Sequence, residues 1–237
     1  MSSPTRFLSG ISTEPKGKPL SDYPYPDPFH TSGSAGLGCV TYYNDFFTIG
    51  STTLDFTLVG APTFAVVSSV GGVARITPAA AATVSTVVNT AQGFQFISGQ
   101  KMWYVTRFKP SAIAAPSAIV GLQAGVLATR THGLHFAMAA GGVISLVSTV
   151  NGVATTLVAN VATASTTAYT DVAFHFDGTD LLVFANDALV SRIAAPTIGA
   201  TGTTLTNSVI GPVYQITPTA SDTLDIDYVL VAEELSR

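Results

Sequence analysis

The chain has 237 residues and 10% of them are charged, whereas globular proteins average about 25%. A net charge of -4, with only 10 scattered Lys and Arg residues, argues against binding to nucleic acid or to an anionic membrane. The length suits one large β domain with an appendage or two small domains, and the single cysteine, Cys39, excludes an internal disulfide.

The first 38 residues are predicted to form an extended arm that ends in a glycine-rich hinge at residues 33–38. Six of the 13 prolines lie in the first 28 residues, and each proline fixes its own φ and favours extended backbone before it. A solvated tail seldom carries many large apolar side chains, so we favour an arm that becomes ordered on a partner over a disordered tail. The expected contact residues are Arg6, Phe7, Leu8, Ile11, Tyr23, Tyr25 and Phe29.

Residues 39–237 are predicted to form an all-β sandwich or jelly roll. Segments rich in Val, Thr, Phe and Tyr alternate with Gly, Pro, Asn or Asp at the spacing typical of these folds. Even Ala79–Ala82 is predicted to be a strand rather than a helix, because Thr-Val-Ser-Thr-Val-Val follows it. The predicted strands are 54–59, 63–69, 72–77, 84–89, 93–97, 101–109, 117–123, 134–139, 143–150, 153–160, 171–177, 181–186, 188–193, 205–216 and 223–232.

One long stretch, between Arg130 and Asp171, contains no Asp, Glu, Lys or Arg. Thr, Ser, Asn and Gly interrupt its apolar residues every few positions, so it is not a membrane-spanning helix. Gly141-Gly142 and Asn151-Gly152 are typical of two-residue hairpin turns. A sheet so poor in charge should be covered by a second sheet or by another subunit.

The strand at residues 101–109 is predicted to be central in its sheet or to lie at a subunit contact. Strand alternation places apolar side chains on both of its faces, with Trp103, Val105 and Arg107 together on one of them. We therefore expect Trp103 and Arg107 to be oligomer contacts, with Arg107 pairing across the sheet or across an interface. The opposite face should carry Met102, Tyr104, Thr106 and Phe108.

Two aspartates near the C-terminus, Asp225 and Asp227, should share one face of a strand about 7 Å apart. That spacing suits the carboxylate pair of a glycosidase. The favoured interpretation is simpler: both aspartates face solvent, opposite core residues of the same strand. Those core residues would be Leu224, Ile226, Tyr228 and Leu230.

Metal-binding patterns are weak. His132 and His135 are three residues apart and would point to opposite faces of a strand, and His175 is isolated. A second set of residues could bind calcium, but turn chemistry explains all of its members; they are Asp177, Asp180, Asn186 and Asp187. Nucleophile elbows, phosphate-binding loops and paired cysteines are absent from the sequence. We therefore expect no metal site, no cofactor and no enzyme activity.

A series of short motifs runs along the whole chain: Thr5-Arg6-Phe7 with Ser9-Gly10, Asp27-Pro28, Tyr43-Asn44-Asp45-Phe46, Gly99–Trp103 with Arg107–Lys109, Phe174–Gly178, Asn186-Asp187, Asp225–Tyr228 and the C-terminal Glu-Glu-Leu-Ser-Arg. In this order the motifs resemble those of a group of structural proteins of tailed-phage virions. The group commonly has Pro where Leu8 stands, and its body carries more charge.

The resemblance implies a concanavalin-like β-sandwich that acts as a capsid decoration, or cement, protein. Such a protein binds the major capsid protein at the outer surface of the head, typically as a homotrimer, and braces the shell. The N-terminus lacks the apolar core of a signal peptide, so we expect synthesis in the host cytoplasm. The alternatives are a sandwich of a tail or head fibre that binds a host surface glycan, and a glycoside hydrolase that uses Asp225 and Asp227.

Overall fold

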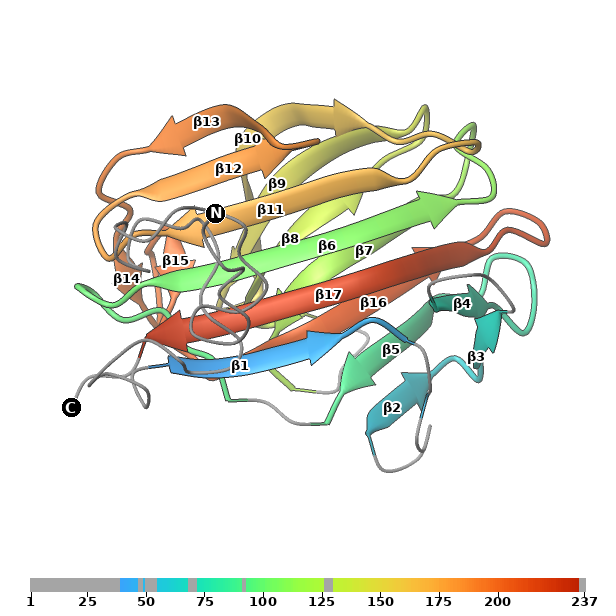
Figure 1. The fold of residues 1–237 in the computed structure, drawn as a ribbon, viewed down its shortest axis with the longest axis horizontal. Helices are drawn as coiled ribbons and strands as arrows, with labels where there is room; N and C mark the ends of the chain where they lie inside the picture. Colours follow the sequence, from blue (N-terminus) through green and yellow to red (C-terminus); the bar gives the residue numbers. More distant parts are fainter. Residues whose placement is uncertain are drawn as a thin grey trace, which may run out of the picture.

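The computed structural model describes residues 39–46, 49, 55–67, 72–90, 93–125 and 130–234. The described residues contain no helix, so none is long and apolar enough to cross a membrane. Two antiparallel sheets pack face to face as a jelly-roll, concanavalin-like sandwich, as predicted (Figure 1). The predicted contacts of the arm lie outside the described residues; they are Arg6, Phe7, Leu8, Ile11, Tyr23, Tyr25 and Phe29.

The eight-stranded sheet has the order β13-β12-β11-β6-β17-β4-β3, and β1 also pairs with β17. The long strand β17 pairs with β6 along one edge, while β4 and then β1 share its other edge. The strands are β1 (Cys39–Asn44), β3 (Thr63–Val67), β4 (Val73–Thr77), β6 (Met102–Pro110), β11 (Thr170–Phe176), β12 (Leu181–Ala185), β13 (Ala188–Ile193) and β17 (Leu224–Glu234).

The seven-stranded sheet has the order β10-β9-β8-β7-β16-β5-β2. Its members are β2 (Phe56–Val59), β5 (Ser85–Asn89), β7 (Ser117–Gln123), β8 (Gly133–Met138), β9 (Val143–Val150), β10 (Val153–Thr163) and β16 (Gly211–Thr217). A short parallel pair, β14 (Ile198–Gly199) and β15 (Leu205–Thr206), lies beside the sandwich.

The core lies between the two sheets and follows from strand alternation. On β6, Met102, Tyr104 and Phe108 are at most 1% exposed, as their predicted inward face requires. Tyr104 stacks on Phe174 of β11 with ring centroids 5.2 Å apart, and Phe136 of β8 lies 6.4 Å from Tyr104. Aromatic residues from both sheets therefore meet across the centre, and each large apolar side chain fully buried there contributes about 1.5–3 kcal/mol.

The observed strands confirm most of the predicted ones, and residues 117–123, 143–150 and 188–193 agree in both bounds. The predicted strand 205–216 is wrong as a single element, because it divides into β15 and β16. The segment 93–97 forms only an isolated bridge, between Phe94 and Ile210, and Ala79–Ala82 forms a turn rather than a strand. Strand β1 was missed, since its pairing with β17 joins opposite ends of the chain.

Strand β17 contains a β-bulge at Asp227. Ile226 pairs with Phe108 of β6, yet Tyr228 already pairs with Arg107, the next residue along β6. One extra residue therefore stands on β17 between the two pairs, and a bulge of this kind reverses the alternation beyond it.

The predicted core face of β17 is wrong beyond the bulge. Leu224 and Ile226 are buried as expected, but the buried residues after the bulge are Val229 and Val231. Tyr228 and Leu230, predicted for the core, share the outer face instead. Their partially exposed positions follow directly from the inserted residue.

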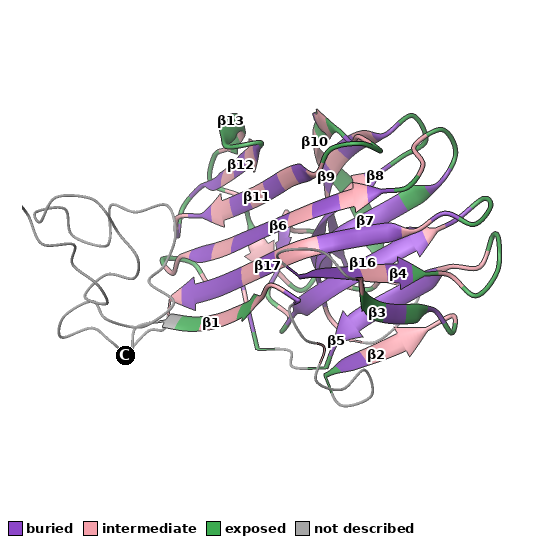
Figure 2. Cartoon of the chain, turned by 45° about the vertical axis from the view of Figure 1, so that its right-hand side comes forward, coloured by how far each residue is buried: buried purple, intermediate pink, exposed green. Residues whose placement is uncertain are grey.

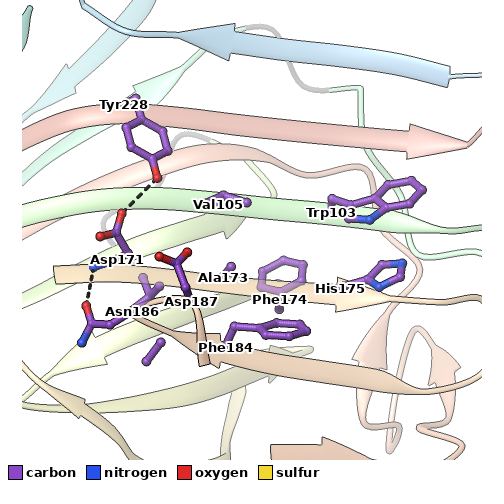
Figure 3. A pocket seen from close by; sticks show the side chains of 12 residues that line it. Trp103, Val105, Asp171, Ala173, Phe174, His175, Phe184, Asn186, Asp187 and Tyr228 are labelled. Carbon is purple, nitrogen blue, oxygen red and sulfur yellow. Dashed lines mark hydrogen bonds between the residues drawn. The ribbon is translucent and has the colours of Figure 1, made fainter. Parts of the chain in front are cut away.

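The turn between β12 and β13 consists of Asn186 and Asp187, with φ values of 47° and 64°. Two consecutive positive φ values are those of a type I′ turn, and Asn and Asp tolerate them better than most residues. The predicted meander from Asp171 to Ile193 is confirmed as β11, β12 and β13. This turn ends beside β11, and its side chains reach the outer face of the sheet (Figure 3).

Candidate functional site on the eight-stranded sheet

The outer face of the eight-stranded sheet carries a pocket of about 320 Å³. Strands β6 and β11 form its floor, because alternate residues of adjacent strands point to the same side. Short side chains in the middle, Ala173 and Val105, leave room between larger groups at the two ends (Figure 3). The outward residues of the two strands are Trp103, Val105 and Arg107 on β6 and Asp171, Ala173 and His175 on β11.

The first end of the pocket is aromatic. Trp103 and His175 are cross-strand partners whose rings stack with centroids 4.8 Å apart and an interplanar angle of 8°. Among the described residues, Trp103 Nε1 and His175 Nε2 are buried without a hydrogen-bond partner. Burial lowers the pKa of His175. Asp177 raises this pKa and Lys101 lowers it, both by smaller amounts, so the imidazole is neutral at neutral pH.

The second end is polar. The Tyr228 hydroxyl donates to Asp171 Oδ1 over 2.9 Å, and the Asp171 backbone N–H donates to Asn186 Oδ1 over 3.2 Å. Asn186 in turn donates its backbone N–H to the carbonyl of Asp171 over 3.0 Å. These bonds fix the β12–β13 turn against β11, and they hold the neighbouring Asp187 at the rim of the pocket (Figure 3).

Arg107 lies beside the polar end and pairs across the sheet, one of the two arrangements that the sequence left open. Its Nη1 is 3.1 Å from Asp227 Oδ2, and its Nε is 3.7 Å from Asp171 Oδ2. Its guanidinium also lies 5.2 Å from the ring centroid of Tyr169, within cation–π range. Trp103 and Arg107 are thus both occupied within the chain, and their role as oligomer contacts stays a prediction.

Asp227 has a raised pKa. Burial is the main cause, and nearby Asp171 and Asp45 add to it, while Arg107 opposes the shift. A carboxyl group with a raised pKa holds its proton at higher pH than usual, as a general acid needs. Asp227 is therefore the residue of this face whose protonation is best suited to acid chemistry.

Asp225 is not the solvent-facing residue that the sequence suggested, since it is 4% exposed. Its two oxygens accept from Arg75 Nε and Nη2 over 2.6 and 2.8 Å. Lys109 Nζ lies 3.9 Å away. Both carboxylate oxygens of Asp225 are thus engaged by Arg75 and Lys109. The pairing holds β4, β6 and β17 together and leaves no free carboxylate at Asp225.

The candidate metal ligands are separated and otherwise engaged. His132 Nδ1 contacts Thr206 Oγ1 at 3.1 Å, whereas His135 is buried on the outer side of the seven-stranded sheet. Asp177 Oδ1 accepts from two backbone N–H groups of its own turn, over 2.8 and 2.7 Å, and Asp180 pairs with Arg192. Within the described ranges, no three His, Cys, Asp or Glu side chains group as a metal site.

Trp103, Arg107 and the turn residues Asn186 and Asp187 stand out in the sequence, but no sequence pattern places them together. His175 was treated as isolated because its stacking partner lies 72 positions earlier in the chain. Tyr228 was assigned to the core because no local signal reveals a bulge. A pairing of β6 with β11 would have predicted the Trp103–His175 stack, but the sequence gives no register for it.

No protein-family profile and no curated protein sequence matches this chain. Among solved structures, a protein of unknown function from Shewanella oneidensis MR-1 is similar, with a TM-score of 0.59 at 14% identity, covering 84% of this chain and 89% of that one. A β-glucanase of Bacillus licheniformis has a TM-score of 0.56 at 9% identity, covering 83% and 98%. An endo-1,3-β-glucanase from Streptomyces sioyaensis has a TM-score of 0.57 at 11% identity, covering 84% and 98%.

These structures correct the prediction that the chain is not an enzyme. That prediction depended on the absence of nucleophile elbows, phosphate loops and paired cysteines, whereas glycoside hydrolysis requires carboxylates, which no such motif reveals. The chain has the fold of the two glucanases. The absence of these motifs is therefore no evidence against an enzyme, and at these identities the likeness shows the fold alone.

Proposed function

We propose that this chain is a capsid decoration protein of a tailed-phage virion that binds carbohydrate in the pocket of its eight-stranded sheet. One observation carries the proposal: five described segments from the motifs of the phage resemblance, distant in sequence, gather around this pocket. The pocket or its immediate border includes residues from 99–103, 107–109, 174–178, 186–187 and 225–228.

The chemistry of the pocket supports carbohydrate as the ligand class. A pyranose ring presents C–H groups that pack on aromatic rings, and Trp103 and His175 offer such rings at one end. Its hydroxyls both donate and accept hydrogen bonds, which suits the carboxylates and amide at the other end. The glucanase folds are consistent with a sugar-binding sheet.

The binding test is isothermal titration or a glycan array with the full chain. We expect a bound glycan, and a loss of at least tenfold in affinity in Trp103→Ala, because the stacking surface is removed. Val153→Ala, on exposed β10 away from the pocket, is the matched control and should bind as the wild type does. Equal affinity in Trp103→Ala and the control would place any sugar site elsewhere.

Cleavage of the bound glycan is a second candidate function, favoured by the raised pKa of Asp227 on this face. Asp227 would donate a proton to the glycosidic oxygen as it leaves, while Asp171, an outward carboxylate on β11, would take a proton from the water that attacks the anomeric carbon. New reducing ends should then appear on incubation with the chosen glycan and disappear in Asp227→Asn. Unchanged glycan after long incubation with the wild type would reject cleavage while leaving binding intact.

Location on the capsid has its own test. The resemblance predicts a trimer on the major capsid protein, with the arm of residues 1–38 as the attachment segment. A chain without these residues should fold but no longer decorate purified shells. Immunogold labelling of the particle should mark the head; labelling confined to the tail would favour a fibre protein instead, and full decoration by the truncated chain would reject the role of the arm.

A further inference from the structure

We infer that the pocket selects neutral oligosaccharides and excludes glycans that carry carboxylate or sulfate groups. This inference deepens the proposed function and depends on carbohydrate binding at that site. It follows from three features of the described residues: the sign of the charges at the polar end, the shortage of free cations, and the pattern of hydrogen-bonding groups along the pocket.

The charged side chains that line the pocket are both acidic, Asp171 and Asp187, and neither Lys nor Arg is among the described lining residues. The nearest cation, Arg107, is committed to Asp227 at 3.1 Å and lies close to Asp171. Lys109 lies 3.9 Å from Asp225 and 4.8 Å from the Tyr169 ring. An incoming anion would therefore meet negative charge without a free cation to offset it.

Asp187 is the decisive residue. Within the described part of the chain, its carboxylate makes no hydrogen bond or ion pair, whereas Asp171 accepts from the Tyr228 hydroxyl. The type I′ turn holds Asp187 in place, because the preceding Asn186 is bonded to β11 through both its backbone and its side chain. An unpaired carboxylate on this anchored turn repels a ligand carboxylate and accepts readily from a ligand hydroxyl.

The aromatic end favours the same class. Trp103 and His175 present stacked, uncharged rings there. A neutral sugar can pack its C–H groups against these rings at one end and donate a hydroxyl to Asp187 at the other. A carboxylate or sulfate group accepts but does not donate, so it cannot satisfy Asp187.

The length of the site indicates an oligosaccharide. Trp103 and His175 stand four residues away from Arg107 and Asp171 along their strands, and a strand rises about 3.3 Å per residue. The two ends are thus about 13 Å apart, which exceeds a single pyranose ring. A chain of several neutral sugars can contact both ends at once.

The experiment compares cellotetraose and laminaritetraose with a β-1,4-linked tetraglucuronate by isothermal titration at pH 7. We expect the wild type to bind at least one neutral probe ten times or more tightly than the acidic probe. In Asp187→Asn that ratio should fall at least threefold, because removing the negative charge raises the affinity for the acidic probe. Asp55→Asn, an exposed charge next to β2, is the matched control and should leave the ratio unchanged.

The outcomes distinguish a failure of carbohydrate binding from a failure of the selection for neutral sugars. If no probe binds and the glycan array is also blank, the proposed carbohydrate function fails. If tetraglucuronate binds as tightly as the neutral probes, or if Asp187→Asn leaves their ratio unchanged, carbohydrate binding stands and the selection for neutral sugars is wrong.

Discussion

The two sheets of the sandwich differ in what their outer faces carry. The outer face of the eight-stranded sheet has three cations and three aspartates in contact, next to an open pocket. On the seven-stranded sheet, the outward residues of the central strands are buried, and Figure 2 shows β5, β7 and β16 mostly in the buried colour. These residues include Thr86, Val88, Ile119, Gln123, His135 and Val213.

His135 shows how far this covering goes. It is 2% exposed, and burial together with the nearby charge of Arg130 lowers its pKa to about 3. Arg130 itself donates to Gln215 over 2.8 Å across the same face. One face is thus arranged around polar groups that a ligand can reach, and the other around groups that are buried and out of reach. The few charged residues of the chain are thus unevenly distributed: among the described strands, they lie on the eight-stranded sheet.

The largest effect is expected from Gly121 on β7, where the covered face tolerates no added atom. A Cβ at this position would lie 2.4 Å from the backbone of His135. Gly121→Ala should therefore separate β7 from β8 and lower the free energy of unfolding by about 3 kcal/mol. The measurement is chemical denaturation. Gly93→Ala, where a Cβ meets nothing within 4 Å, is the control, and equal stability in the two variants would contradict the close packing.

Asp225→Asn tests the charged face in the same way. The variant leaves Arg75 and Lys109 without their shared carboxylate and puts an amide in a buried position, so a loss of about 2–3 kcal/mol is expected. Denaturation of Asp225→Asn, Arg75→Gln and the double variant measures the coupling. Additive single losses would show that the fork contributes nothing as a pair.

Lowering the pH should reduce the free energy of unfolding through His135, which lies on the covered face of the seven-stranded sheet. Its folded pKa of about 3 lies below the value of about 6.5 in the unfolded chain, so the unfolded chain takes up the proton first. The contribution of neutral His135 to the free energy of unfolding is complete above about pH 6.5. It falls by at most about 1.4 kcal/mol per pH unit as the pH decreases towards 3.

The pH test compares wild type with His135→Gln, whose stability should fall less steeply between pH 6.5 and 4.5. This comparison is needed because other groups titrate: the pKa of His175 is lowered too, whereas burial raises those of Asp227 and Glu233, which acts in the opposite direction. Parallel curves for the two proteins would mean that His135 is not sealed from water.

The smallest effect on stability, and a direct test of self-association, is expected at Val153 on β10. This edge strand carries no charged residue and Val153 is 66% exposed, so the edge lacks the charges that usually block pairing with another chain. Val153→Lys should change the free energy of unfolding by less than about 0.5 kcal/mol. If copies associate through β10, light scattering should show a lower mass than for wild type, and Ser117→Lys should not.

Much of the fold could be predicted because its signals are local. Alternation on β6 gave both faces correctly, and the Asn186-Asp187 and Asn151-Gly152 pairs gave hairpins whose positive φ values the structure contains. The uncharged stretch from residue 131 to 170 supplies β8, β9 and β10, and the expectation of a covered sheet agrees with β8, which is mostly buried, but not with β10, which is mostly exposed.

The candidate site was less predictable because its contacts are distant in sequence. Trp103 meets His175, and Tyr228 meets Asp171, only after the order β11-β6-β17 is formed. Asp225 was expected in water because nothing near it in the sequence announces Arg75, which is 150 positions away. Cross-strand register, rather than residue type, determines these neighbours.

Asp227, the extra residue in β17, has two roles that different mutations can separate: it forms the bulge, and it supplies a carboxyl group. Deleting it would remove the bulge and leave a regular strand, in which Tyr228 follows Ile226 directly and Val229 and Val231 still face the core. Replacing it by Asn keeps the count and removes only the acid. Related chains could therefore lose the carboxyl group at this position and still keep the bulge. Their aligned sequences would then show one extra residue at this point of the strand, with a side chain that varies.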